Sequence, residues 1–208
     1  MYVPGAFAVD NPEALQALIA TYDFATLISN GPDGLTATHV PILLDAARGS
    51  HGTLVTHLAR ANPHAHALHG ADALVVFQGP HAYVSPSLYA THPSVPTWNY
   101  AVVHAYGKAR MVTEPQPLLA MLRDLVRKHE SGRAVPWSMD GLQPEYVDRM
   151  LRGIVGIEIE IGRIEGKNKL SQNRNRVDRS KVIEGLAGSV HAHDRELAAY
   201  MTTHAPPQ

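Results

Sequence analysis

One stretch of the chain, IVGIEIEIGRIEG at residues 154–166, limits the fold more than any other. Ile157, Ile159 and Ile161 fall on one face of a β-strand, because side chains alternate between the two faces of a strand. The two glutamates between them fall on the other face. The stretch therefore predicts a β-strand with one apolar and one charged face.

Five other segments have the apolar and β-branched content that is typical of strands. They are FATLIS (24–29), LTATHVPILLD (35–45), GTLVTHLA (52–59), DALVVFQG (72–79) and NYAVVHAYGKARMV (99–112). The first two predict a hairpin with a turn at NGPDG (30–34), and Pro41 predicts a break or an edge in its second strand. The central residues of 72–79 are continuously apolar, so this strand is expected to be buried on both faces.

Helices are predicted where apolar residues recur at helical spacing behind a start signal. They begin near Asn11–Pro12, at Asn62–Pro63, near 116, at Pro144, within the basic stretch 167–186 after a loop, and near 194. The six or more strands show no regular alternation with helices, which argues against a doubly wound sheet. A small antiparallel barrel with helices added at its ends fits better, so the expected class is mainly β with added helices.

The composition narrows the class of protein further. The 208 residues suit one domain, and only 18% of them are charged, which predicts extra buried surface, for example at a subunit interface. A net charge of −1 gives no support to dedicated nucleic-acid binding, although charge can be local. The chain has no Cys, which excludes disulfides, thiolate metal sites and a Cys nucleophile. Without a signal peptide or a membrane-length apolar run, a cytoplasmic protein is expected.

The segment between Gly79 and Gly107 is rich in Tyr, Trp, His and Pro and contains no Asp, Glu, Lys or Arg. Its prolines restrict the backbone and lower the entropic cost of holding one shape. Tyr83 and Trp98 offer flat apolar faces with polar tips. This mixture suits a planar heteroaromatic ligand. Packing against a partner subunit would use the same residue types, so both interpretations stay open.

Three further segments contain polar side chains suited to ligand binding. Arg60 lies just after a strand, and Asn62 precedes a predicted helix, so both are candidates for binding phosphate. Thr38 and His39 face opposite ways in the middle of one strand. The basic EGKNKLSQNR (165–174) could bind an anion or a ring edge, although each of these segments could equally be structural.

Several common sites have no sequence support. The His-Ala-His pairs at 64–66 and 191–193 lack a spacing that supplies a third metal ligand, so no metal is expected, although a zinc site from scattered histidines stays open. The chain contains no nucleophile elbow, no Walker A loop and no dinucleotide-binding glycine motif. No catalytic residue can be named from the sequence.

Several segments together resemble a known family. VVFQGPHAYVSPSLY, VPTWNYAVVHAYG and VGIEIEI…EGKNKLSQNR occur in this order in the PaiB-like proteins, after FATLIS, ATHVPILLD and GTLVTHLARANP. These proteins are described as FMN-binding negative transcriptional regulators of the FMN-binding split-barrel superfamily, which also contains pyridoxamine-phosphate-oxidase-like proteins. The resemblance covers residues 1–186, and residues 187–208 are expected to form a helical tail of the same domain.

The resemblance implies an antiparallel, Greek-key-like split β-barrel and a homodimer that binds FMN at its interface. The residues it implies for cofactor binding are Thr38, His39, Arg60, Asn62, Tyr83, Trp98, Lys169, Ser171, Gln172 and Arg174. It also implies that flavin carries any redox reaction, so no side chain need act as an acid or base, although His39, His81 or Tyr83 could.

The function stays open between several classes. The family implies a transcriptional regulator or a flavin-dependent redox protein acting on a small-molecule ligand, with DNA open as a partner. A haem-binding or haem-degrading split-barrel protein is an alternative, suggested by 13 histidines. A DNA-binding repressor without flavin chemistry is another, suggested by the basic residues at 167–181.

Overall fold

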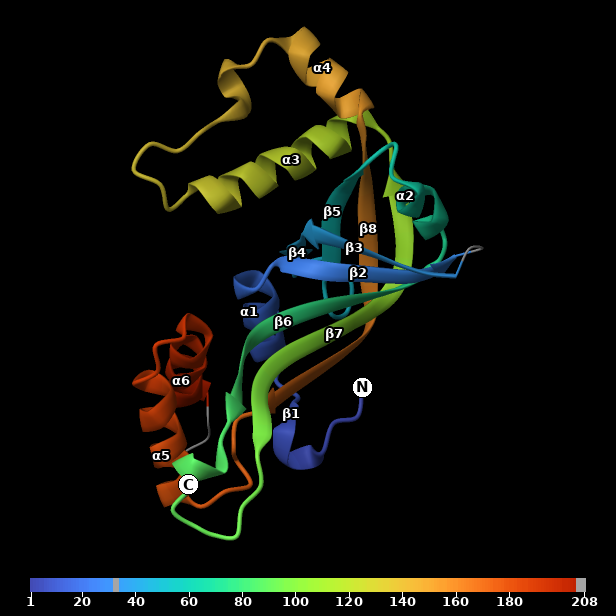
Figure 1. Ribbon diagram of the computed structural model, residues 1–208. Coiled ribbons are helices and arrows are strands. Elements are labelled where there is room, and N and C mark those ends of the chain that lie inside the picture. The colour runs from blue at the N-terminus through green and yellow to red at the C-terminus, as the bar shows by residue number, and fades with distance from the viewer. Residues whose placement is uncertain (32–33, 205–208) are drawn as a thin grey trace. The chain divides into compact units, whose positions relative to one another are not determined.

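The computed structural model describes residues 1–31 and 34–204 (Figure 1). Its strands are β1 (Ala8–Val9), β2 (Phe24–Gly31), β3 (Gly34–Pro41), β4 (Leu43–Asp45), β5 (Thr53–Ala59), β6 (Asp72–Val84), β7 (Thr97–Val112) and β8 (Ile154–Lys169). Its α-helices are α1 (Pro12–Thr21), α2 (Pro63–Leu68), α3 (Pro115–Glu130), α4 (Pro144–Arg152), α5 (Arg176–Ala187) and α6 (Ala192–His204). Short 3₁₀ turns occur at Gly5–Phe7, Pro86–Leu88 and Met139–Gly141.

The strands form one sheet in the order β3-β2-β6-β7-β8-β5-β4, and β1 pairs with β8. The pairings β2–β3, β2–β6, β4–β5 and β5–β8 are all antiparallel. Strands β5 and β8 are neighbours in the sheet although they are far apart in the sequence. Such pairing gives the sheet the Greek-key character that the family resemblance implies. The expected class, mainly β with added helices, is confirmed. The hydrogen-bonded order does not close, because β3 and β4 end it.

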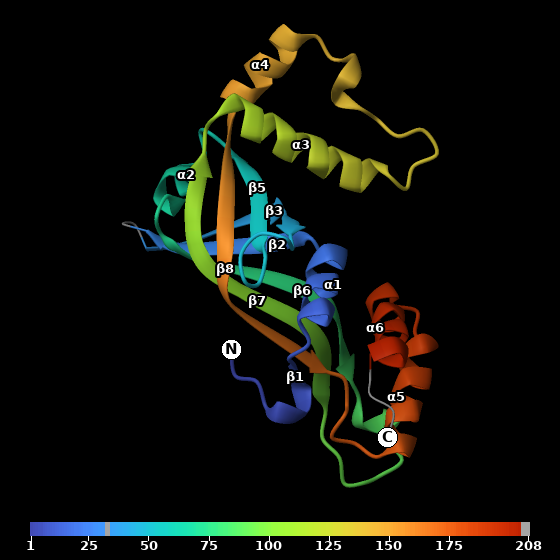
Figure 2. The ribbon, with the colours of Figure 1, turned by 180° about the vertical axis from the view of Figure 1, so that it is seen from behind.

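The chain divides into two compact units, and β6, β7 and β8 contribute residues to both. Unit 1 consists of residues 1–18, 77–104 and the described residues from Glu165 onward, and unit 2 consists of residues 19–76 and 105–164. In unit 1, α5 and α6 lie side by side (Figures 1 and 2). They bury Val182, Leu186, Leu197 and Met201 together with β6 and loop side chains.

The strand that most limits the fold behaves in unit 2 as its pattern predicts. Ile157, Ile159 and Ile161 are all buried. Glu158, on the opposite face, accepts hydrogen bonds from both terminal nitrogens of Arg48 and forms an ion pair with Arg110. The hydrogen bonds from Arg48 are the main reason that the pKa of Glu158 is lowered. Ion pairs thus hold Glu158 on the charged face of β8, while the apolar face of the strand forms the core.

The hairpin and its proline also follow the prediction. β2 and β3 pair in register from Phe24↔Pro41 to Gly31↔Gly34, while residues 32 and 33 of the predicted turn lie outside the described residues. β3 is an edge strand and ends at Pro41, where a proline costs no ladder hydrogen bond. Ile42 then interrupts the strand, and its backbone N–H donates to the Asp23 carbonyl at 2.8 Å.

Two expectations were wrong. The apolar run in β6 is not buried on both faces, because buried and partly exposed residues alternate along the strand. The apolar residues at helical spacing that predict α4 are Tyr146, Val147, Met150 and Leu151. Of these only Leu151 is buried, and Tyr146 and Met150 remain 44% and 46% exposed. In both cases, apolar spacing located the element, but how much of it is covered depends on the neighbouring elements.

Gly107 in β7 should not tolerate a side chain. A Cβ at this position would clash with the carbonyl oxygen of Glu160 and lie 2.9 Å from a methyl of Ile159. We expect Gly107→Ala to lower the free energy of unfolding by roughly 2–4 kcal/mol, measured by urea denaturation, because backbone cannot move aside cheaply. Gly132→Ala is the control, since no atom lies within 4 Å of its Cβ position. Equal urea midpoints of unfolding for the two variants would contradict the close approach of Gly107 to the Glu160 carbonyl.

Candidate functional site

The aromatic segment forms a row of rings in unit 1. His81 and Tyr83 are two residues apart near the end of β6, so they share one face of the strand, and Trp98 lies on the neighbouring strand β7. The rings of Tyr83 and Trp98 meet edge to face, with centroids 6.0 Å apart. Tyr83 is 48% exposed and Trp98 is 54% exposed. Unlike core aromatics, these two rings keep half their surface available to a ligand.

Histidines extend this row. The ring of His81 lies 6.4 Å from the Trp98 ring, and its other neighbour is His193 of α6, which stacks at 5.9 Å and 20°. We call His81, Tyr83 and Trp98 the aromatic row. All three side chains come from the two strands that flank the proline-rich loop, which explains why the sequence places them in one uncharged segment.

A buried carboxylate holds the loop between these strands. Asp178 of α5 is 1% exposed, and its Oδ1 accepts hydrogen bonds from the backbone N–H groups of Ala90 at 2.8 Å and Thr91 at 3.0 Å. Burial acts to raise the pKa of Asp178, but the donors from Thr91 and Ala90 outweigh it and lower the pKa. Tyr89 beside them is 4% exposed and belongs to the core, so it is not available to a ligand.

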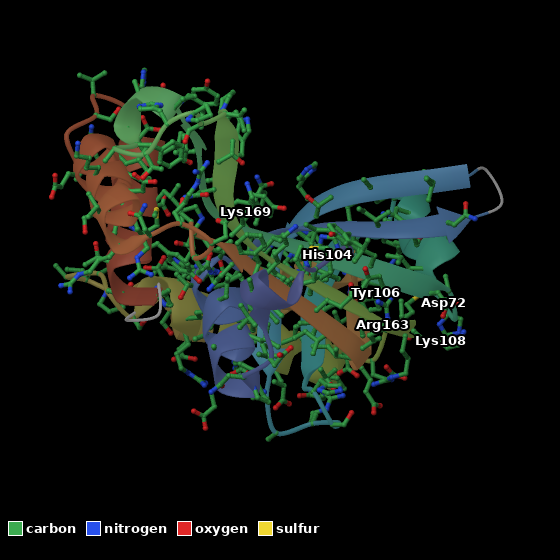
Figure 3. The ribbon with its side chains drawn as sticks, turned by 90° about the horizontal axis from the view of Figure 1, so that it is seen from below. Asp72, His104, Tyr106, Lys108, Arg163 and Lys169 are labelled. Atoms are coloured by element: carbon green, nitrogen blue, oxygen red, sulfur yellow. The ribbon has the colours of Figure 1, made fainter. Side chains whose placement is uncertain are left out.

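The predicted residues of KLSQNR lie at and after the end of β8. The Lys169 ammonium donates to the Trp98 carbonyl at 2.6 Å and to the Thr97 hydroxyl. Burial, aided by the nearby charge of Lys167, lowers the pKa of Lys169. Figure 3 labels this side chain. The structure thus brings Lys169, Trp98 and Tyr83 together, as the sequence could not show.

The next residues of this segment contact the protein itself. Ser171 has φ 64°, is 3% exposed and accepts a hydrogen bond from the Asn99 amide at 2.9 Å. The Gln172 side-chain amide bonds to the backbone that precedes it: its oxygen accepts from the Leu170 N–H, and its nitrogen donates to the Asn168 carbonyl. The Arg174 guanidinium lies 4.2 Å from the centre of the Tyr89 ring and donates to Ser94. These three side chains shape the turn that follows Lys169.

The other predicted residues lie in unit 2. Thr38 of β3 bonds to the His64 ring through its hydroxyl, with 2.7 Å between Oγ1 and Nδ1, whereas His39 faces the opposite way and is exposed. Asn62 caps α2 as predicted, and its side chain accepts from the His64 N–H at 3.0 Å. Arg60 donates to the carbonyls of Arg152 and Ile154 at 2.8 and 3.0 Å. His64 therefore links two of the four predicted residues.

Sequence reasoning missed His64 and His57. His64 is 1% exposed and is bonded at both ring nitrogens. Nδ1 of His57 in β5 is buried and meets no hydrogen-bond partner among the residues that the structure describes. Burial lowers the pKa of both histidines. The only sequence signal was their position, His57 in a predicted strand and His64 at a predicted helix start. Because the chain has 13 histidines, this signal does not single them out.

Unit 2 also carries a groove of about 410 Å³ outside all the predicted residues. The Arg163 guanidinium lies 3.5 Å from the centre of the Tyr106 ring on its wall, and Asp72, also lining the groove, pairs with Lys108 (Figure 3). No three His, Asp or Glu side chains of the described residues are placed to hold a metal ion. No helix among those residues is both long and apolar enough to cross a membrane.

Comparison with known proteins identifies the class. Residues 1–163 match the model of the family described as "Putative FMN-binding domain". The chain belongs to this FMN-binding, PaiB-like family, and FMN is its cofactor. It is 37% identical over 202 residues to protease synthase and sporulation protein PAI 2 of Bacillus subtilis, covering 97% of this chain and 96% of that one.

Further comparisons agree with the family and the fold. An uncharacterised protein of Emericella nidulans is 34% identical over 188 residues, covering 73% of this chain and 75% of its own. The solved FAD- and haem-binding protein of Mycobacterium smegmatis has a TM-score of 0.59 at 18% identity, covering 78% of this chain and 73% of that chain. The solved flavocytochrome Anf3 of Azotobacter vinelandii has a TM-score of 0.59 at 15% identity, and the match covers 78% of this chain and 69% of that chain. The split-barrel fold is thereby confirmed.

The two buried histidines predict how stability depends on pH. Their pKa values are lowered below about 6.5, so the unfolded chain binds more protons than the folded chain as the pH falls through that value. Stability must then decrease with falling pH. We expect a lower melting temperature at pH 5.5 than at pH 7.5 and a smaller difference in His57→Gln, by scanning calorimetry. A wild type whose melting temperature rises on acidification would contradict this.

Proposed function

We propose that this protein is a flavin-dependent redox or redox-sensing protein in which the FMN ring lies against Tyr83 and Trp98. One observation carries the proposal: two half-exposed rings of an uncharged segment meet edge to face, and the Lys169 ammonium of β8 donates to the backbone carbonyl of one of them, Trp98. Exposed aromatic rings that lie in contact with one another form the kind of apolar surface that ligand and interaction sites use. An isoalloxazine ring, flat and apolar with polar edges, has the matching chemistry.

The donors near the aromatic row suit the flavin ring. Lys169 already lies against the Trp98 carbonyl, and its lowered pKa reflects a partly dry environment, where a cation interacts more strongly with polar ligand atoms. Bound FMN would supply hydride or electron transfer. The chain would orient the ring through Tyr83 and Trp98 and donate from Lys169, while Ser171, Gln172 and Arg174 hold the turn behind it.

Within unit 2 alone, Thr38, His39, Arg60 and Asn62 are proposed as polar side chains that suit an anion such as a phosphate group. Two hydrogen bonds to backbone carbonyls fix the Arg60 guanidinium, although this residue is exposed. Little side-chain conformational entropy is therefore lost when the guanidinium binds an anion. Asn62 would add a hydrogen bond, and Thr38 and His39, which face opposite sides of β3, offer polar groups on the two faces of that strand. The unpartnered Nδ1 of His57 marks a further polar group that a bound molecule or water would satisfy.

A regulatory role is proposed to act through the flavin and a homodimer, rather than through a basic DNA-reading surface. The relative PAI 2 is named for protease synthesis and sporulation, which supports regulation. The basic residues at 167–181 are mostly engaged within the fold. Lys167 is 8% exposed and donates to the Tyr2 carbonyl, Arg174 stacks on Tyr89, and Arg179 is 9% exposed.

The two tryptophans of the chain give a matched test of flavin binding. Trp98 is 54% exposed and Trp137 is 51% exposed, but only Trp98 belongs to the aromatic row. We expect wild type to quench FMN fluorescence on titration and Trp98→Ala to bind roughly tenfold more weakly, because one stacking contact contributes about 1–2 kcal/mol.

Trp137→Ala should bind FMN like wild type. Equal weakening by both alanine variants would contradict the proposed place of the ring. If neither FMN spectra nor the melting temperature of wild type changed on mixing, the flavin function itself would be wrong. A Soret band on titration with haem, tighter than any flavin response, would favour the haem alternative.

The engagement of the basic residues also predicts weak DNA binding. Binding through phosphates loses affinity steeply as salt rises, in proportion to the cations involved. We expect no salt-sensitive shift of promoter DNA from the protein's own operon at 150 mM salt, about physiological, with the FMN-loaded protein. A shift that disappears at high salt and in Arg176→Ala/Lys181→Ala would restore the DNA-binding alternative.

A further inference from the structure

Residues 122–150, which we call the helical arm, contain no buried residue. The arm lies within unit 2 and consists of the greater part of α3, the turn at Met139–Gly141 and most of α4. The start of α3 is attached to the sheet, because Leu118 and Met121 are buried and lie against Gly156 of β8. After Met121, the next buried residue is Leu151 near the end of α4.

The contacts within the chain do little to stabilise this arm. Ordering the backbone costs about 1–2 kcal/mol per residue, and an isolated helix shorter than about 12 residues is marginal in water. α4 has 9 residues and buries Leu151 alone. An ion pair between Lys128 and Asp23 attaches the end of α3 to the chain outside the arm. We therefore expect α4 to gain further burial from a partner.

The apolar and the charged residues of α4 lie on opposite faces of the helix. At about 100° per residue, one face carries Tyr146, Val147, Met150 and Leu151, and the other carries Glu145, Asp148, Arg149 and Arg152. The apolar face is only half covered. Leu151 is buried and Val147 is partly buried, whereas Tyr146 and Met150, one turn apart, are 44% and 46% exposed.

The charge of the arm favours a second copy of this chain as the partner. The arm contains five Arg or Lys residues and five Asp or Glu residues, so its net charge is zero. A surface that binds nucleic acid or anionic lipid has a basic excess, which this segment lacks. A surface without net charge does not repel its own copy.

The charges along α4 also complement those of a second α4. Glu145 lies in the first turn, and Arg149 and Arg152 lie in the last. A helix that meets its copy across a perpendicular two-fold axis runs antiparallel to it, so each acidic end faces a basic end. With the axis at residue 148, Tyr146 lies opposite Met150 of the second copy, and Glu145 lies near the two arginines of that copy.

We propose that α4 forms an interface between two copies of this chain, in which the two helices pair antiparallel and bury Tyr146 and Met150. This inference rests on the proposed homodimer and gives it a location, but it uses no residue that is proposed to contact FMN. A stable interface buries about 800 Å² on each partner, more than one face of α4 offers. Val135 and Trp137 of the same arm, 86% and 51% exposed, provide further apolar surface.

Because the chain has no Cys, introduced cysteines test the register of this pairing. Positions 146 and 150 are about 6 Å apart along the helix, so each lies opposite the other position, rather than its own, in the second copy. An equilibrated mixture of Tyr146→Cys and Met150→Cys should form more mixed disulfide on mild oxidation than random pairing gives, as measured by mass spectrometry. Asp148→Cys, on the charged face of the same helix, is the control and should not cross-link.

Assembly in solution gives a second test. Met150→Glu places a carboxylate in the paired face of each copy, so we expect the dissociation constant of the dimer to rise at least tenfold, by sedimentation velocity. Val190→Glu is the matched control, because Val190 is 86% exposed and lies outside the arm. It should assemble like wild type. Circular dichroism of both variants shows whether they are folded.

The outcomes separate this interface from the homodimer itself. If wild type is a dimer that Met150→Glu leaves intact, or if Asp148→Cys cross-links as readily as the mixture, the α4 interface is wrong and the homodimer stands. If wild type sediments as a monomer, both are overturned. Because assembly is measured rather than flavin binding, neither result changes the proposed flavin function.

Discussion

A buried carboxylate, that of Asp178, binds the proline-rich loop between β6 and β7 to helix α5. Asp178 accepts two backbone N–H groups of the loop and is itself held at the start of α5 by Asn175, whose side chain accepts from the Asp178 N–H. Prolines reduce the number of shapes that the loop can take, but they do not choose among those shapes. Asp178 binds the loop at Ala90 and Thr91, and the loop then leads into Trp98 in β7. This interaction joins segments almost ninety residues apart in the sequence.

Much of the fold follows from local patterns. Alternation in β8, the proline at the edge of β3 and the Asn62 cap each depend on neighbouring residues, so the sequence contains the whole signal for them. How far an element is buried by segments distant in the sequence has no such local signal. The exposure of Tyr146 and Met150 on α4, and the alternating burial along β6, depend on what packs against them, and local spacing does not encode this.

The same division applies to the candidate site. The sequence identified Tyr83, Trp98 and Lys169 as residue types suited to a flavin, but only the fold shows that Lys169 donates to the Trp98 carbonyl. The partners of His64 could not be found from the sequence, because Ser29 and Thr38 lie in the β2–β3 hairpin, far from α2 along the chain. Roles that depend on one side chain's chemistry are visible in a sequence, whereas roles that depend on a partner are not.

The central claim is that the FMN ring lies against the aromatic row of unit 1. A crystal structure of the protein grown with FMN tests it most directly. The account predicts isoalloxazine density in van der Waals contact with Trp98 or Tyr83 and a hydrogen bond from Lys169 to the ring. Clear flavin density elsewhere, with Trp98 and Tyr83 uncovered, would contradict it.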